Sequence, residues 1–333
     1  MNRPLFLLSL VIGLSLCGCT MAPKYTRPES PVPSQWPTSA AYQQAGQATS
    51  VPQVAELPWR EFITDARLRE IVETALKNNR DLRVTALNVE KARAMYGIGR
   101  VSLLPSVNAA GLWYKERIPP DLSSTRSAYT TEKYSVNLGI TSWEIDFFGR
   151  LRSLKDNALE EYLATDQAMR SSRLLLISTV SQAYLALAAD IEALQLVSKT
   201  LAAQEEAYRL IRKRYDVGMT SELDLRRAQT QVDTARGDVA RYTQLVAQDE
   251  NALNLLAGSP IRRDLLPVDL AGVGGTRDIS CGLFSETLLN RPDVLAAEHR
   301  LKAANANIGA ARAAFFPRIA LTTSVGTASA DLS

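Results

Sequence analysis

The stretch that decides the fold is LISTVSQAYLALAADIEALQLVSKTLAAQEEAYRLIRKRYDVGMTSELDL, residues 176–225. It overlaps a run from Arg150 to Arg214 without proline or glycine, whose 65 residues would extend roughly 97 Å as one helix. Apolar residues recur there in steps of four and three, the spacing of a coiled-coil seam. The seam comprises Leu176, Val180, Ala183, Leu187, Leu194, Val197, Leu201, Tyr208, Ile211 and Tyr215, with Asp190 and Gln204 as polar exceptions. We therefore predict one long helix that packs against a second helix.

The segment Asp216–Ser221 predicts a turn, because Gly218 can adopt a positive φ angle. Thr220 or Ser221 is expected to cap the next helix, with Asp224 in its first turn, where the helix dipole favours a carboxylate. That helix continues to about residue 257 and has its own seam: Ala228, Val232, Ala235, Val239, Tyr242, Val246, Asp249, Leu253 and Leu256. We predict a long antiparallel helical hairpin over 144–258.

The N-terminus has the pattern of an export signal. An apolar run over residues 5–16 is too short to span a bilayer as a helix. Cys19 follows Gly18, which resembles the signal of lipoproteins, in which the cysteine is acylated. We predict a lipoprotein signal peptide over 1–18 and lipidation of Cys19; a plain secretory signal with incidental cysteines is the alternative. The lipidated segment 19–58 is rich in proline and is expected to form an extended arm.

Residues 59–102 have helical periodicity, interrupted at Asn78 and Asn79. Asp81 is the expected N-cap of the helix that follows the interruption, and Pro105 ends that helix.

The region 103–143 predicts a β-hairpin. Lys133–Trp143 alternates apolar and polar residues, and Ser106–Tyr114 does so more weakly. The polar segment Lys115–Glu132 contains two consecutive prolines and is expected to be an exposed loop. Strands of about ten residues with one apolar face fit a membrane β-barrel, and a soluble hairpin is an equal alternative.

An internal repeat relates positions 212 residues apart, as the identical pairs Leu76 and Leu288, Asn78 and Asn290, Asp81 and Asp293, Ala92 and Ala304, Gly97 and Gly309, Arg100 and Arg312, and Pro105 and Pro317 show. A linker and the start of a second copy, a helix and a strand, are therefore expected over 259–333. Because the second strand and the long hairpin of this copy are missing, we expect the 333 residues to be a fragment or truncated product, unable to build a working channel alone.

Composition excludes several other functions. The chain has 38 Lys and Arg against 35 Asp and Glu, a balance that argues against a dedicated nucleic-acid binder. A single histidine argues against a histidine-built metal site, and no serine or cysteine lies in a nucleophile motif. We predict no enzyme, no metal, no nucleic-acid partner, and no cofactor apart from the covalent lipid on Cys19.

These features together resemble the TolC-like outer-membrane factor family, and in particular its lipoprotein branch in resistance-nodulation-division efflux. Besides Cys19, the motifs that carry the resemblance are Pro23–Pro28, Trp143–Arg150, Arg214–Gly218 with Leu223–Leu225, Asn290–Asp293 and Gly309–Pro317. The resemblance implies a mainly α fold with membrane β: a homotrimer whose long antiparallel helical hairpins form a periplasmic α-barrel. Each protomer would add four strands to one shared twelve-stranded outer-membrane β-barrel.

The implied function is a passive outer-membrane exit duct of a tripartite drug efflux pump in a Gram-negative bacterium. Its implied partners are outer-membrane lipid, a periplasmic adaptor (membrane fusion) protein and an inner-membrane resistance-nodulation-division transporter. A type I protein-secretion duct and a periplasmic coiled-coil scaffold lipoprotein are the alternatives.

Site residues follow from the resemblance by position. The adaptor-docking tip would comprise Asp216, Val217, Gly218, Met219, Thr220 and Ser221. Asp224 would help to hold the entrance closed; the equal alternative is that it only complements the helix dipole. The strand–helix junction would comprise Trp143, Asp146, Gly149 and Arg150, with Trp143 at the membrane interface and Gly149 permitting a bend.

Overall fold

A computed structural model describes residues 20–29, 31–33, 57–277 and 285–330. The chain divides into two units, of which the first contains residues 1–29, 89–166 and 296–333 and the second contains the rest. Three helices, α4 (Arg80–Val101), α5 (Arg150–Asp216) and α7 (Pro292–Ala313), contribute residues to both units.

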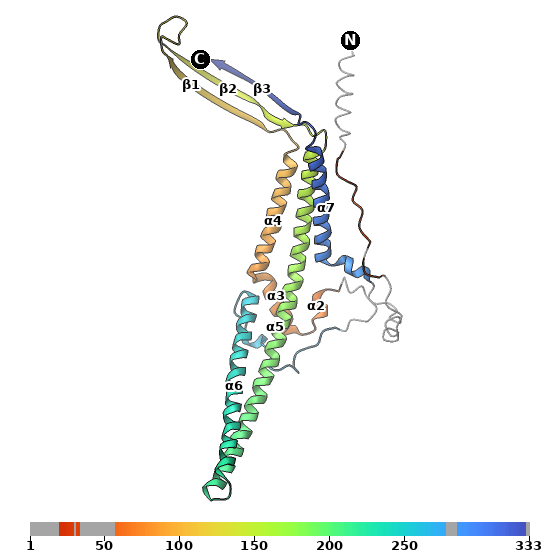
Figure 1. The fold of residues 1–333 in the computed structure, drawn as a ribbon, viewed down its shortest axis with the longest axis vertical. Helices are drawn as coiled ribbons and strands as arrows, with labels where there is room; N and C mark the ends of the chain where they lie inside the picture. The colour runs from red at the N-terminus through yellow and green to blue at the C-terminus, as the bar shows by residue number, and fades with distance from the viewer. Residues whose placement is uncertain (1–19, 30, 34–56, 278–284, 331–333) are drawn as a thin grey trace. The chain divides into compact units, whose positions relative to one another are not determined.

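The first unit contains an antiparallel sheet with the strand order β1-β2-β3 (Figure 1). Its strands are β1 (Val107–Ile118), β2 (Tyr129–Glu144) and β3 (Ala320–Ser329). The strands of the hairpin are longer than the alternation predicts, so the expectation of a loop over the whole of Lys115–Glu132 is wrong at both ends. Lys115 lies opposite Glu132 in the ladder and forms an ion pair with it. Charged residues continue the strands because they pair across the hairpin.

The helical part of the first unit packs through small residues. On α7 the buried residues are Ala296, Ala303, Ala306, Gly309, Ala310 and Ala313. Asn157 of α5 donates a hydrogen bond to the carbonyl of Ala303 at 2.9 Å. Nearby, Nδ1 of His299 lies 2.7 Å from a carboxylate oxygen of Glu160. These contacts hold α7 close against α5 in this unit.

The second unit contains the main hydrophobic core. Its other helices are α2 (Trp59–Phe62), α3 (Ala66–Asn78), α6 (Glu222–Ala257) and the short 3₁₀ turns η4 (Arg263–Leu265) and η5 (Ser285–Asn290). One apolar face of α3 packs onto the middle of α5 and the last turns of α6, and the core residues are Ile63, Leu68, Ile71, Val72, Ala75, Leu82, Leu176, Val180, Tyr184, Leu187, Leu253 and Leu265. Burial raises the pKa of the Tyr184 phenol to about 12.

The helical hairpin predicted from the heptad pattern is present, with α5 and α6 side by side up to the turn that joins them (Figure 1). In the first seam, Val180 and Leu187 are fully buried, and in the second seam Leu253 is. The polar exceptions Asp190 and Asp249 meet between the helices, where burial and the neighbouring carboxyl raise the pKa of Asp249. Part of α5 is long and apolar enough to cross a membrane by length and composition, a test that core helices of soluble proteins also pass.

The break between α3 and α4 differs from the sequence prediction. The cap of α4 is Asn79, not Asp81: its Oδ1 accepts a hydrogen bond from the Leu82 amide at 2.8 Å. Asn79 also donates from Nδ2 to the carbonyl of Leu256, near the end of α6, at 3.0 Å. The prediction was wrong because an amide can satisfy a helix start and a helix end at once, which a carboxylate cannot.

Candidate functional site

The turn at the end of the helical hairpin is closed by a Schellman motif. Gly218 has a φ angle of +74° and donates from its amide to the Tyr215 carbonyl at 2.8 Å. Met219 donates to the Arg214 carbonyl at 2.8 Å. These bonds satisfy carbonyls at the end of α5 that the helix itself leaves free. The backbone of the turn is therefore fixed, and its side chains point outward from a defined frame.

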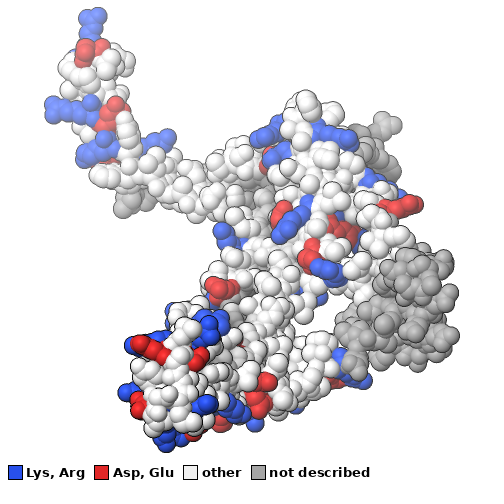
Figure 2. All heavy atoms as spheres, turned by 60° about the horizontal axis from the view of Figure 1, so that its bottom comes forward, with Lys and Arg blue, Asp and Glu red and all other residues white. Residues whose placement is uncertain are grey.

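Large apolar side chains are exposed at this turn. Val217 and Met219 are each 69% exposed and Leu223 is 59% exposed. Charged side chains of both signs lie on this end of the hairpin (Figure 2), and Glu222 forms an ion pair with Arg226. Apolar residues rimmed by polar ones are the pattern of a protein-binding surface.

Asp224 is engaged within its own turn. Its Oδ2 accepts hydrogen bonds from the Ser221 hydroxyl at 2.6 Å and from the Thr220 hydroxyl at 3.1 Å. The Asp224 amide in turn donates to Ser221 Oγ at 3.2 Å, so Ser221, one of the two predicted candidates, is the N-cap of α6. The Ser221 and Thr220 hydroxyls hold the pKa of this carboxyl below its ordinary value. Among the described residues, we find no ion pair that links Asp224 to another helix.

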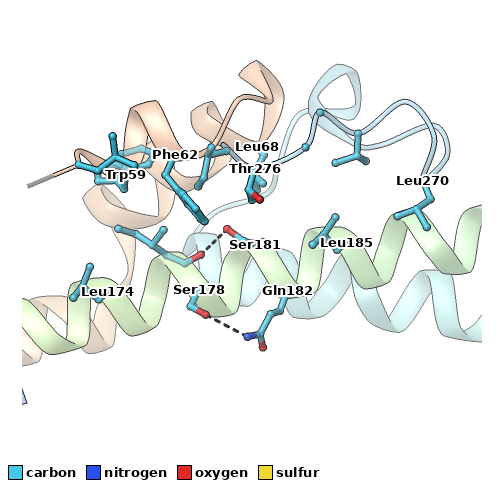
Figure 3. Close-up of a pocket in the computed structure, with 16 residues that line it drawn as sticks. Trp59, Phe62, Leu68, Leu174, Ser178, Ser181, Gln182, Leu185, Leu270 and Thr276 are labelled. Carbon is cyan, nitrogen blue, oxygen red and sulfur yellow. Dashed lines mark hydrogen bonds between the residues drawn. The ribbon is translucent and has the colours of Figure 1, made fainter. Parts of the chain in front are cut away.

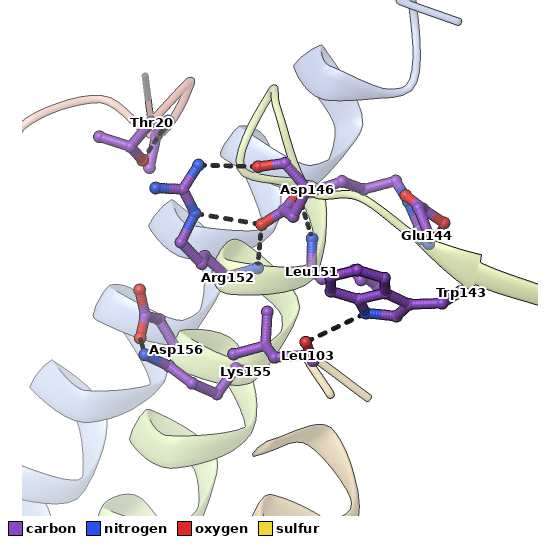
Figure 4. Close-up of polar contacts among 11 residues, drawn as sticks. Thr20, Leu103, Trp143, Glu144, Asp146, Leu151, Arg152, Lys155 and Asp156 are labelled. Atoms are coloured by element: carbon purple, nitrogen blue, oxygen red, sulfur yellow. Dashed lines mark hydrogen bonds and ion pairs between the residues drawn. The ribbon is translucent and has the colours of Figure 1, made fainter. Parts of the chain in front are cut away.

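A second cluster lies where β2 becomes α5 (Figure 4). Asp146 accepts hydrogen bonds from the amides of Leu151 at 3.1 Å and Arg152 at 2.9 Å, so it caps the start of α5. Arg152 folds back onto Asp146, with Nε 3.1 Å from the carboxylate. Gly149 has a φ angle of +75°, the left-handed conformation that the bend requires.

Two more contacts brace this junction. Arg150 and Glu144 form a bidentate ion pair, with Nε 2.8 Å from Oε1, and this pair raises the pKa of Arg150. The indole nitrogen of Trp143 donates to the Leu103 carbonyl at 3.2 Å, which ties the end of β2 to the segment between α4 and β1. The structure thus brings the four predicted junction residues together, and it adds Glu144 and Arg152.

The described part of the N-terminal arm lies along α7. Asn305 donates to the Pro23 carbonyl at 2.8 Å, and Arg27 and Tyr25 both donate to the carboxylate of Glu298. The hydrogen bond from Arg27 lowers the pKa of Glu298 to about 2. Only the small residues of α7 hint at this contact in the sequence. Cys19 and the predicted signal peptide 1–18 lie outside the described residues.

The second unit also contains an apolar cleft of about 640 Å³ (Figure 3). Trp59, Phe62 and Leu68 line one wall, and Leu174 and Leu185 of α5 line the other. Its polar side chains are few, and Ser178 and Gln182 bond to each other. Sequence reasoning missed this cleft, because a loop around residue 270 closes it from far along the chain.

Comparisons with known proteins match this architecture. The family model described as outer membrane efflux protein matches residues 71–259 and 283–333. The probable efflux pump outer membrane protein TtgC of Pseudomonas putida is 44% identical over 328 residues, which cover 98% of this chain and 67% of that protein. The outer membrane protein OprJ of Pseudomonas aeruginosa is 44% identical over 339 residues, which cover 100% of this chain and 69% of that protein.

Solved structures give the same result. The open-state MtrE outer membrane channel of Neisseria gonorrhoeae has a TM-score of 0.79 at 37% identity, covering 94% of this chain and 68% of that one. A membrane protein from Pseudomonas aeruginosa has a TM-score of 0.81 at 42% identity, covering 94% of this chain and 69% of that one.

A long capped hairpin and a strand–helix junction that leads into a sheet define the class of TolC-like outer-membrane channel protomers. The chain belongs to the outer membrane efflux protein family. The sequence-based prediction of the family and of the fold class is confirmed.

Proposed function

We propose that this outer-membrane component of an efflux pump acts as one protomer of a passive, trimeric exit duct and performs no catalysis. Its membership of the outer membrane efflux protein family supports a channel. An inner-membrane resistance-nodulation-division transporter would supply the energy, and a periplasmic adaptor would link it to the duct. The observation that carries the assignment of a docking end is the exposed apolar tip on a rigid Schellman turn.

The adaptor-docking tip in this proposal is the turn Asp216–Ser221. Val217 and Met219 are exposed in a backbone that is already ordered, so binding them costs little conformational entropy. A partner with a complementary apolar hairpin or groove would bury them at the centre of an interface.

A photo-crosslinking residue at Val217 tests the docking site in cells. We expect a crosslinked product that contains the adaptor, identified by mass spectrometry. The control is the same crosslinker at Leu255, which is 80% exposed near the other end of α6. An adaptor crosslink from Leu255 but not from Val217 would contradict the docking assignment.

Replacement of Gly218 by valine tests the same turn through its backbone. A left-handed conformation costs an ordinary residue about 1–2 kcal/mol, so the turn would change shape. We expect weaker pump coupling, measured as greater drug susceptibility at equal protein abundance. Unchanged susceptibility at equal abundance would remove the assignment.

The gate role of Asp224 is a separate proposal. Ser221 and Thr220 hold its carboxylate at a fixed position. In a trimer, a residue of a neighbouring helix would therefore bond to a carboxylate that is already oriented. Asp224→Asn keeps a side-chain acceptor but removes the charge. We expect this variant to admit a large antibiotic that the closed duct excludes, while Asp233→Asn, an exposed control on α6, does not.

We also propose that Cys19 carries the lipid. The described part of the arm contacts α7 from Met21 to Arg27. Extraction of membranes that contain the Cys19→Ala variant tests the alternatives. A scaffold held by lipid alone would move to the soluble fraction, whereas a channel anchored by its sheet would stay in the membrane fraction. Family membership and the three-stranded sheet disfavour the scaffold, and the names of the relatives favour efflux over protein secretion.

A further inference from the structure

Three arginines near the ends of α4 and α7 have no assigned role. Arg100 lies in the last turn of α4 and Arg312 in the last turn of α7, at equivalent positions of the internal repeat. Arg318 lies two residues before β3. All three are exposed, and we find no ion pair for any of them among the described residues.

Contacts within the first unit join the chain segments that follow Arg100 and Arg318. Trp143 bonds to Leu103, three residues after Arg100. The Ile145 amide donates to the Ile319 carbonyl at 2.9 Å, one residue after Arg318. The end of β2 is therefore in contact with the segments that start β1 and β3. Arg100 and Arg318 therefore lie close in sequence to the boundary between helices and sheet, and Arg312 lies in the last turn of α7.

The acidic residues at this boundary do not neutralise the three arginines. Glu144 is engaged by Arg150, and Asp146 is engaged by Arg152. The boundary thus carries uncompensated positive charge next to strands of a membrane sheet.

An aromatic residue accompanies the charge. Phe315 follows Arg312 by three residues and is 90% exposed, more than any other large apolar residue described. Its neighbour Phe316 instead stacks on Phe148, with ring centroids 4.5 Å apart. Phe316 thus packs within the boundary, and Phe315 is exposed. Exposed aromatic rings and arginines at one level are typical of a membrane–water interface.

The described part of the arm also reaches the end of α7. Arg312 donates to the Met21 carbonyl at 3.4 Å, and Ala22 lies against Gly309 so closely that a Cβ there would be 2.8 Å from it. Met21 and Ala22 therefore lie against the C-terminal turns of α7.

We propose that Arg100, Arg312, Arg318 and Phe315 form a phospholipid-binding belt, in which the arginines bind headgroup phosphates of the periplasmic leaflet of the outer membrane. This belt rests on the proposed placement of the sheet in that membrane. The arginines form ion pairs with the phosphates, and Phe315 inserts between headgroups. The belt fixes the depth of the sheet in the membrane.

Flotation of the full chain with preformed vesicles tests the belt. The Cys19→Ser background removes the acyl group, and vesicles of phosphatidylcholine are compared with vesicles that also contain phosphatidylglycerol. Because each arginine near an anionic surface contributes about five-fold to binding, Arg100→Gln, Arg312→Gln and Arg318→Gln together should lose roughly 100-fold on anionic vesicles. The three lysine substitutions at the same positions should keep most of the binding.

A charge-matched control separates the belt from net charge. Arg83→Gln, Arg212→Gln and Arg227→Gln remove the same charge at exposed positions elsewhere on the helices. An equal loss in both triple variants, or no loss in either, overturns the proposal. Displacement by soluble glycerol phosphate also overturns it, because that result assigns a site for free phosphate. Far-UV circular dichroism must show equal helix content in all variants. Docking is measured separately by the Val217 crosslink, so failure of the belt in the flotation assay leaves the proposed docking site standing.

Discussion

Substitution of Asn79 tests whether Asn79, as the structure shows, or Asp81, as the sequence pattern predicts, is the N-cap of α4. Asn79→Ala removes the N-cap of α4 and leaves the Leu256 carbonyl without its side-chain donor. A lost N-cap costs about 1 kcal/mol, and the lost hydrogen bond to the half-buried Leu256 carbonyl costs about 1 kcal/mol more. Since Asn79 is only 8% exposed, water replaces neither bond fully. We expect a local destabilisation of about 2 kcal/mol.

Hydrogen exchange of the Leu82 amide measures this local stability directly. A loss of about 2 kcal/mol corresponds to roughly 30-fold faster exchange. Asp81→Ala is the matched control, because Asp81 is exposed and contributes only a dipole interaction of about 0.5 kcal/mol, or roughly two-fold. Equal acceleration in the two variants, or acceleration by Asp81→Ala alone, would refute our assignment of the cap.

Three further predictions concern the arm and the hairpin seam. Gly309→Val should release the arm, which would lower the fluorescence anisotropy of a label at Thr20. Gly97→Val at the repeat-equivalent position is the control and should not release it, because a Cβ on Gly97 meets nothing within 4 Å. The folded pKa of Glu298 lies below its ordinary value, so the arm should stay bound above about pH 4.5 and detach as pH falls towards 2; unchanged anisotropy across that range would contradict this. Because the pKa of Asp249 is raised by folding, Asp249→Asn should raise the urea midpoint at neutral pH and lose this advantage in acid, and an equal gain at both pH values would count against it.

The hairpin could be predicted because its information is local and periodic. The seam from Leu176 to Tyr215 alternates steps of four and three, and the Gly218 turn has a local signature. The family resemblance added the correct fold class, since the motifs at Trp143–Arg150 and Asn290–Asp293 are specific in combination.

The remaining features depend on residues that are distant in sequence. Asn79 caps α4 while it bonds to Leu256, and no local rule contains that second partner. Lys115 and Glu132 look like loop residues until the strand register places them opposite each other. The arm on α7 has no periodicity to detect, because it is extended and proline-rich, and its position is set by the bonds of Glu298 and Asn305.

The free edge of β1 has a consequence for the kinetics of biogenesis. Every ladder partner of its 12 residues lies on β2, so one row of peptide groups has no strand beside it in the described sheet. In hydrocarbon each such group costs several kcal/mol, so a lone sheet does not enter the membrane until another edge meets it. The helical hairpin satisfies its own backbone and folds at any concentration. Membrane insertion should therefore follow a higher reaction order than folding, and at low expression the chain should accumulate in the periplasm with its helices formed and its strands outside the bilayer.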